Sequence, residues 1–190
     1  FPTRRSSDLG VAVTAALGVL LAVLVPWQQL ASAVGGEGEG TATPTSSETA
    51  GAGGTDSVRS DRRAPRRAPV ELARELTSLR QRVVVDLDTD ALDQLVEPDS
   101  PEDRRDRALV EQLSTSGDRF DGVDLTVRNA RLERTSGSTA VLRTTTDESA
   151  YSVISSDGER ERHPARRAQK VDLVLAWHEN NWRVRDVRPV

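Results

Sequence analysis

The stretch Val123–Thr146, VDLTVRNARLERTSGSTAVLRTTT, decides the fold. Apolar and polar residues alternate on both sides of Ser136-Gly137, a dipeptide typical of a hairpin turn. The parity of the alternation changes near Arg128–Asn129, which predicts a β-bulge there. The stretch therefore predicts two antiparallel strands, of which the first is kinked.

Three further strands are expected downstream of this hairpin. Tyr151–Ser155 alternates and ends at Asp157-Gly158, while Val171–Trp177 and Trp182–Asp186 alternate on either side of a turn. The intervening stretch Glu159–Ala168 is densely charged and shows no alternation, so we expect a loop.

Helical periodicity precedes the strands. Apolar residues recur at spacings of three and four from Val70 to Leu87, directly after Pro69, which predicts an amphipathic helix of four or five turns. Asp88 supplies a cap for a short second helix, which ends before Pro98 because the residue preceding a proline disfavours helical geometry.

A third helix is expected to begin at Ser100-Pro101 and to end at Gly117. Its buried side is predicted to carry Leu109, Val110 and Leu113. Helices first and antiparallel strands afterwards predict an α+β fold, with the N-terminal helices packed on one face of a curved, mostly antiparallel sheet. This domain is expected to span residues 69–190.

The first nine residues, FPTRRSSDL, resemble the in-frame translation of a common short-read sequencing adapter. We interpret residues 1–9 as a sequencing artefact and expect the native N-terminus to be missing. Arg4 and Arg5 then carry no information about membrane topology. The alternative is a genuine positively charged flank.

Residues 10–30 form an apolar segment without charge. Its length lies between the roughly 7–15 residues of a signal-peptide core and the roughly 20 of a membrane span. Trp27 suits the membrane interface and favours a retained transmembrane anchor, whereas Ala31 and Ala33 form an A-x-A cleavage site. We expect a single-pass bacterial membrane protein with its domain on the extracytoplasmic side. The alternative is secretion after cleavage near Ala33.

Residues 31–68 are expected to form a flexible linker, because they are rich in Gly, Ser, Thr and Ala. Five arginines gather at the end of the linker: Arg59, Arg62, Arg63, Arg66 and Arg67. Two interpretations stay open for this cluster. It attracts anionic lipid or an acidic polymer, or it is a solvated hinge.

Composition excludes several function classes. The chain has no Cys, which rules out disulfides, thiolate metal sites and cysteine nucleophiles. Its net charge of −4 has the wrong sign for a dedicated nucleic-acid surface, so no nucleic-acid partner is expected. Only 3% of the residues are aromatic, which predicts a small core. Arginine replaces lysine everywhere except at Lys170, a usage that resembles a high-G+C bacterial proteome.

The predicted order of elements resembles a known superfamily. Three helices followed by a bulged meander that ends in W-x-V-x-x-V, at Trp182, Val184 and Val187, resemble the nuclear transport factor 2-like cone, also called the SnoaL or ketosteroid-isomerase superfamily. The segment LDQLVEPDSPEDRRDRALVEQL (92–113), with Y-x-V-x-x-x-D-G from Tyr151, is similar to membrane-anchored actinobacterial members of unassigned role. The resemblance covers residues 69–190 and implies a cone-like sheet, and this fold hosts enzymes and non-enzymes alike.

Five residues are candidates for lining a cone pocket. Enzymes of this fold use a carboxylate or a His–Asp pair as general base, and Asp86 and Asp93 are the carboxylates in reach of the cone's mouth. Helix capping or an exposed helix face is the simpler explanation for both. Tyr151, Trp177 and Trp182 either line a pocket for an apolar ligand or form the core.

No catalytic residue, metal site or cofactor is predicted. His163 and His178 are expected to lie in solvent, and neither has a metal-binding partner at a suitable spacing. Asp86–Asp90 with Glu97 approaches a calcium-loop pattern, but Ala91 stands where the loop requires glycine. Helix capping accounts for these carboxylates.

Two function classes follow. The leading interpretation is a non-catalytic, membrane-tethered module that binds a partner protein or self-associates through its exposed sheet. The alternative is an isomerase- or hydratase-type enzyme with a buried Asp, or a carrier of an apolar ligand. A pocket-facing Asp with a raised pKa beside Tyr151 or a Trp would favour the enzyme, and an interior filled by Leu, Val and Trp would favour the module.

Overall fold

The computed structural model describes residues 57–190. The predictions for residues 1–9, for the anchor at 10–30, for cleavage at Ala31 and Ala33, and for the linker before Ser57 lie outside the described residues. No helix within residues 57–190 is long and apolar enough to cross a membrane. The elements are η3 (Val58–Ser60), α1 (Ala64–Arg67), α2 (Pro69–Asp86), α3 (Thr89–Leu95), α4 (Pro101–Ser116), β1 (Arg119–Asp121), β2 (Leu125–Ser136), β3 (Thr139–Glu148), β4 (Tyr151–Ile154), β5 (Arg160–His163), β6 (Arg166–His178) and β7 (Asn181–Pro189).

The three predicted helices are present, and their ends have the expected causes. The Asp88 side chain accepts a hydrogen bond from the Ala91 N–H at the start of α3, and Ser100 caps α4 through the Asp103 N–H. Gly117 ends α4 in left-handed geometry at φ 73°. The local signals in the sequence were therefore sufficient to place these helices.

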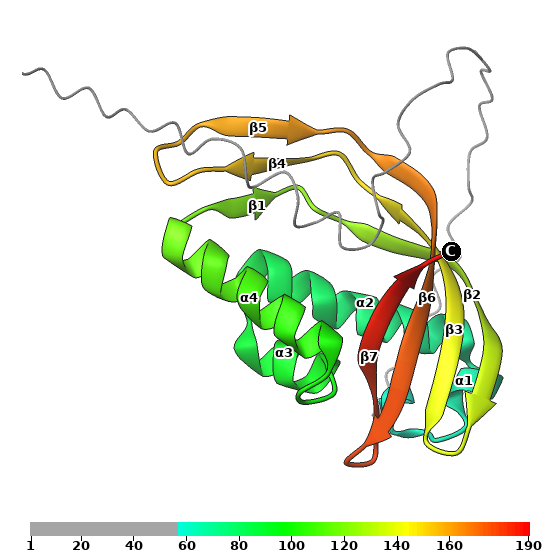
Figure 1. The fold of residues 1–190 in the computed structure, drawn as a ribbon. Helices are drawn as coiled ribbons and strands as arrows, with labels where there is room; N and C mark the ends of the chain where they lie inside the picture. The colour runs from blue at the N-terminus through cyan, green and yellow to red at the C-terminus, as the bar shows by residue number, and fades with distance from the viewer. Residues whose placement is uncertain (1–56) are drawn as a thin grey trace, which may run out of the picture.

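The strands form two antiparallel sheets, with order β2-β3-β6-β7 in one and β1-β4-β5 in the other. The hairpin at Ser136-Gly137 is confirmed, and so is the irregularity near Arg128–Asn129, because the β2–β3 register shifts between Val127 and Asn129. Further shifts at Leu132/Arg134, Thr146/Glu148 and Val174/Leu175 bend the four-stranded sheet around the helices. Figure 1 shows the resulting curved α+β arrangement.

The expected loop at Glu159–Ala168 is wrong. Arg160–His163 forms β5, which pairs with Tyr151–Ile154, and β6 begins at Arg166. β5 is an edge strand whose exposed side chains are charged, so backbone pairing holds it without any apolar alternation. β1 was also missed, since it is only three residues long.

Residues 57–68, which precede the expected start of the domain at residue 69, are packed against it. Arg59 is 8% exposed, and its guanidinium donates to Glu75 Oε1 at 3.0 Å and to the Gln94 carbonyl at 2.7 Å. Ala64 and Pro65 of α1 are buried as well. Residues 57–68 are therefore packed against the domain and do not form a hinge, although Arg62, Arg63, Arg66 and Arg67 are exposed.

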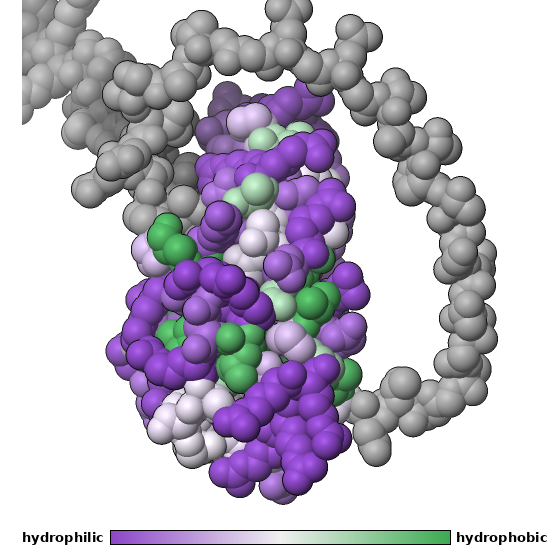
Figure 2. All heavy atoms as spheres, turned by 90° about the vertical axis from the view of Figure 1, so that its right-hand side faces the viewer, coloured by the Kyte–Doolittle hydropathy of each residue, from purple (hydrophilic) through white to green (hydrophobic). Residues whose placement is uncertain are grey.

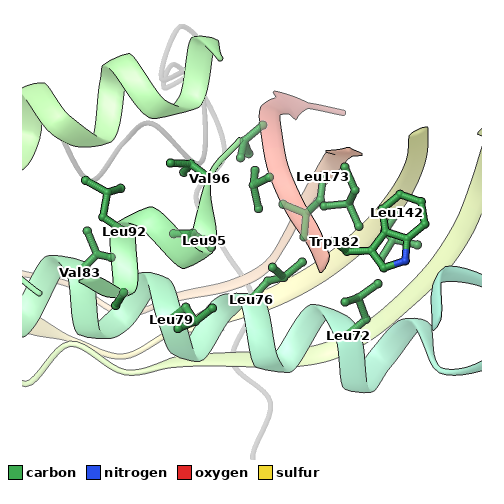
Figure 3. Packing of buried hydrophobic residues seen from close by; sticks show 14 of the residues in the cluster. Leu72, Leu76, Leu79, Val83, Leu92, Leu95, Val96, Leu142, Leu173 and Trp182 are labelled. Carbon is green, nitrogen blue, oxygen red and sulfur yellow. The ribbon is translucent and has the colours of Figure 1, made fainter. Parts of the chain in front are cut away.

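The main core lies between the helices and the inner face of the four-stranded sheet. Figure 3 shows α2 directing Leu72, Leu76, Leu79 and Val83 toward residues of α3 and the sheet. A second apolar cluster joins α4 to the three-stranded sheet through Leu109, Leu113, Phe120, Tyr151 and Val153, among others.

Candidate functional site

A small cavity lies between α2 and the curved sheet. Its volume is about 30 Å³, the space that one water molecule occupies in the liquid. Ligand pockets of proteins typically measure ~300–1,000 Å³. The residues that line the cavity are Leu76, Thr77, Arg80, Leu125, Thr144, Thr146, Val171, Leu173, Val184 and Val187.

Arg80, which lines this cavity from α2, anchors a buried ionic cluster. Its guanidinium donates to Glu102 Oε1 at 2.6 Å and to Asp106 Oδ1 at 2.7 Å. The side chain of Glu102 is fully buried and that of Asp106 is 3% exposed. Arg105 closes the cluster from outside by donating to Glu102 and to Asp186 of β7.

The cluster shifts the pKa values of its members. Burial raises the pKa of Asp106 to about 6, although Arg80 opposes the shift. Burial disfavours the charge on Arg80, but Asp106 and Glu102 outweigh it and raise the pKa of Arg80. Asp106 Oδ2 is buried and accepts no hydrogen bond within the described part of the chain.

This cluster was missed in the sequence. Glu102 and Asp106 belong to a run of nine acidic residues between positions 86 and 106, which read as a solvated face. Their partner Arg80 lies 22 and 26 residues earlier. The only available signal was the position of Glu102 and Asp106 at an i, i+4 spacing, on a face that continues to Leu109 and Leu113.

The five predicted pocket residues do not converge on one cavity. Asp86 and Asp93 are exposed, and Asp93 accepts a hydrogen bond from Arg107 at 2.6 Å. Trp177 and Trp182 lie edge to face with ring centroids 5.4 Å apart at the β6–β7 hairpin. Tyr151 belongs to the other apolar cluster.

Tyr151 stacks on His163, which the sequence placed in solvent. The two ring centroids are 4.7 Å apart, and the His163 side chain is only 16% exposed. Burial, together with the nearby Glu148 carboxylate, raises the pKa of Tyr151 to about 12. The β4–β5 pairing brings the two rings together, because Tyr151 and His163 are directly opposite in the register.

An arginine-lined hollow of about 240 Å³ lies beside the tip of the β2–β3 hairpin. We call it the arginine hollow, and its lining consists of Arg62, Arg63, Pro65, Arg66, Thr135, Gly137 and Trp182. The indole N–H of Trp182 donates to the Asp61 carbonyl at 3.1 Å, which fixes the arginine segment to β7. The Arg62 guanidinium lies over the Trp177 ring, 5.7 Å from its centroid.

A second hollow, of about 210 Å³, lies on the outer face of the four-stranded sheet. Val141 and Val174 form its apolar floor, and Arg134, Arg185 and Arg188 stand around it. Figure 2 shows the side of the molecule that carries β2 and β3, where hydrophilic residues predominate and hydrophobic ones occur in small separate groups. Within residues 57–190, no group of three or more His, Asp or Glu side chains is placed to hold a metal ion.

No family model matches the chain, and no curated protein matches its sequence. In structure, the chain is similar to the intermembrane space region of the chloroplast protein ARC6, with a TM-score of 0.50 and 13% identity over 65% of this chain and 99% of that one. A protein assigned as an aromatic ring hydroxylase from Novosphingobium aromaticivorans aligns with a TM-score of 0.42 and 14% identity, over 61% of this chain and 83% of that one. At these identities the first similarity concerns the fold alone.

Proposed function

We propose that this chain is a membrane-tethered, non-catalytic binding module of the nuclear transport factor 2-like type, held on the extracytoplasmic side of a bacterial membrane. The order of helices and strands and the curved sheet support the superfamily assignment. The apolar segment at residues 10–30 supports the tether.

The single observation that carries the proposal is the filled interior. A cavity of about 30 Å³ is too small for a substrate or an apolar cargo, since ligand pockets start near ~300 Å³. Leu142, Leu175 and Trp182, each at most 2% exposed, belong to the core that fills the space between the helices and the four-stranded sheet.

Asp106 does not favour the enzyme alternative. Its pKa is raised, as a general base requires. However, its carboxylate is 2.7 Å from the Arg80 guanidinium, in a cluster closed by Arg105, and it does not line the cavity. A carboxylate enclosed in this way links α4 to Arg80 of α2.

The outer face of the four-stranded sheet is the proposed partner surface. Arg134, Arg185 and Arg188 surround a small apolar floor there. Arg185 pairs with Glu97 and Arg188 with Asp186, so Arg134 is the one arginine of the three without an ion pair within residues 57–190. The charge of this face therefore fits an acidic partner protein and a second copy of the chain alike.

The filled interior is tested by ¹H–¹⁵N spectroscopy of the full chain, titrated with benzene and a small panel of apolar ligands. We expect no localised shifts in the wild type. The Leu173→Ala variant is the matched control: removing this cavity-lining side chain enlarges the space, and dry apolar cavities of ~150 Å³ bind benzene. Shifts at Leu76 and Val171 in the wild type would overturn the module and support the carrier or the enzyme.

A further inference from the structure

We propose that the arginine hollow binds the phosphate headgroup of an anionic phospholipid, giving the domain a second contact with the membrane that carries its tether. The proposal rests on the tether in the proposed function. It adds a binding site, a ligand class and an orientation of the domain.

The arginine hollow carries positive charge. Arg62, Arg63 and Arg66 are exposed and make no ion pair with any residue in the described range 57–190. Most other arginines of the domain are neutralised locally, as Arg143 is by Asp172 at 2.9 Å. The three arginines line one hollow, and guanidinium groups bind phosphate oxygens through paired N–H donors.

The size of the hollow fits a headgroup. About 240 Å³ corresponds to roughly eight water molecules at ~30 Å³ each. This space accommodates a phosphodiester with a short polyol and is smaller than the pockets that enclose a whole drug-sized ligand.

The hollow is a rigid part of the domain. Ala64 is fully buried against the core, and Pro65 is buried beside it. The Trp182–Asp61 hydrogen bond and the contact of Arg62 with Trp177 hold the arginine segment against the β6–β7 hairpin. A backbone segment that is already docked loses little conformational freedom on binding, which favours affinity.

The position of the hollow in the chain favours a membrane ligand over a soluble one. Arg62–Arg66 follow Ser57 closely, where the predicted tether joins the domain. A Gly-rich coil of the length of residues 31–56 has a root-mean-square reach on the order of 30 Å. Such a tether keeps the hollow at millimolar effective concentration of headgroups, so a weak phosphate site suffices.

The test uses the full chain in phosphatidylcholine vesicles with or without about 30% phosphatidylglycerol, because anionic lipid sets the surface potential. The chain has no Cys, so Ser138→Cys carries a single spin label. Ser138 is exposed beside Gly137 of the hollow. Ser114→Cys, exposed on α4, is the reference label away from the hairpin (Figure 1). Label immersion is read from accessibility to oxygen and to a nickel chelate.

We expect phosphatidylglycerol to immerse the Ser138→Cys label and to leave the Ser114→Cys label in water. A triple Arg62→Gln, Arg63→Gln, Arg66→Gln variant should reduce the immersed fraction by about tenfold, because it removes the charged groups that line the hollow. The matched control changes three exposed arginines outside the hollow, Arg74, Arg119 and Arg162, to Gln and should keep the immersion.

Three results would overturn the proposal. The first is that phosphatidylglycerol does not immerse the Ser138→Cys label. The second is that both triple variants lose immersion equally, which would show attraction by net charge alone. The third is that the Ser138→Cys and Ser114→Cys labels are both immersed. Inorganic phosphate at constant ionic strength should displace the label from the vesicle. If inorganic phosphate binds at the arginine hollow and vesicles cause no immersion of the label, the site is assigned to a soluble phosphate instead.

The tether is tested separately by flotation. A chain that fails to float with pure phosphatidylcholine vesicles has no anchor, which refutes the tether in the proposed function. A chain that floats but shows no phosphatidylglycerol-dependent immersion refutes the headgroup site alone. The two failures are thus distinguishable.

Discussion

Asp106 gives the domain a pH-dependent stability. Its pKa of about 6 in the folded state lies above the unfolded value of 3.8 because the carboxyl is buried. The folded state therefore holds the proton longer, and stability falls as the pH rises from about 4 to about 6, by on the order of 3 kcal/mol. Above pH 6 this contribution is constant.

The Asp106→Asn variant removes that titration. We expect the free energy of unfolding of the wild type, minus that of the variant, to fall between pH 4 and pH 6 and then to level off. The difference between the two proteins removes the pH dependence contributed by carboxylates whose pKa is lowered, such as Glu75 and Asp186. Urea unfolding at a series of pH values measures it, and parallel curves for the two proteins would contradict the assignment.

Arg80 and Arg82 offer a matched pair on one helix. Arg80→Ala leaves Glu102 and Asp106 as buried, uncompensated carboxylates, and we expect a loss of about 3–5 kcal/mol in the free energy of unfolding. Arg82 pairs with Asp88 at the surface, with its own side chain 53% exposed. Arg82→Ala should therefore leave the urea midpoint nearly unchanged, and equal effects would exclude a special role for the buried cluster.

At the scale of elements, the end of α4 depends on Gly117. Its φ of 73° is left-handed, and an added Cβ would lie 3.2 Å from the Ser156 Cβ. We expect Gly117→Ala to lower the free energy of unfolding by more than the ~1–2 kcal/mol of the backbone penalty. Gly137→Ala has only that penalty, because open space surrounds its Cβ position. A Gly137→Ala variant that is the less stable of the two would contradict this account.

The rate of trypsin cleavage reports whether the segment with η3 and α1 stays packed against the domain. No Lys or Arg lies between residues 6 and 58, so the arginines at 59–67 are the first sites after the N-terminal pair. We expect these sites to resist cleavage in the folded chain. Trp182→Phe removes the hydrogen bond to the Asp61 carbonyl, and cleavage there should accelerate about fivefold, since a net hydrogen bond contributes ~1 kcal/mol. Rapid cleavage of the wild type would refute the docked segment.

Sequence patterns predicted the elements that local signals define. Asp88 and Ser100 cap helix starts with their side chains, and Gly117 ends a helix with its left-handed backbone, so α3 and α4 were found. Long-range partners define the rest. β5 forms because its backbone pairs with the edge of β4. Arg59 is buried because Glu75 and the Gln94 carbonyl accept hydrogen bonds from its guanidinium. The residues of the arginine hollow and of the Arg80 cluster come from segments far apart in the chain, so no local sequence pattern predicts either site.

At the scale of the whole molecule, we expect a monomer. Val85 and Val190 are the only large hydrophobic side chains that the described residues expose. Stable homodimers generally bury a larger apolar area. Light scattering of the chain, with the apolar segment solubilised, should give the mass of one copy in low and in moderate salt. A dimer that persists at both salt concentrations would contradict this expectation and support self-association through the sheet.

The edge-to-face contact of Trp177 and Trp182 gives the domain an optical signature. We expect two indoles 5.4 Å apart at an interplanar angle of 68° to couple their electronic transitions and to produce a split circular-dichroism band. The band exists only while β6 and β7 are paired at their hairpin, since those two tryptophans are directly opposite in the register. Its intensity therefore follows this one hairpin, while the peptide absorption follows the whole chain.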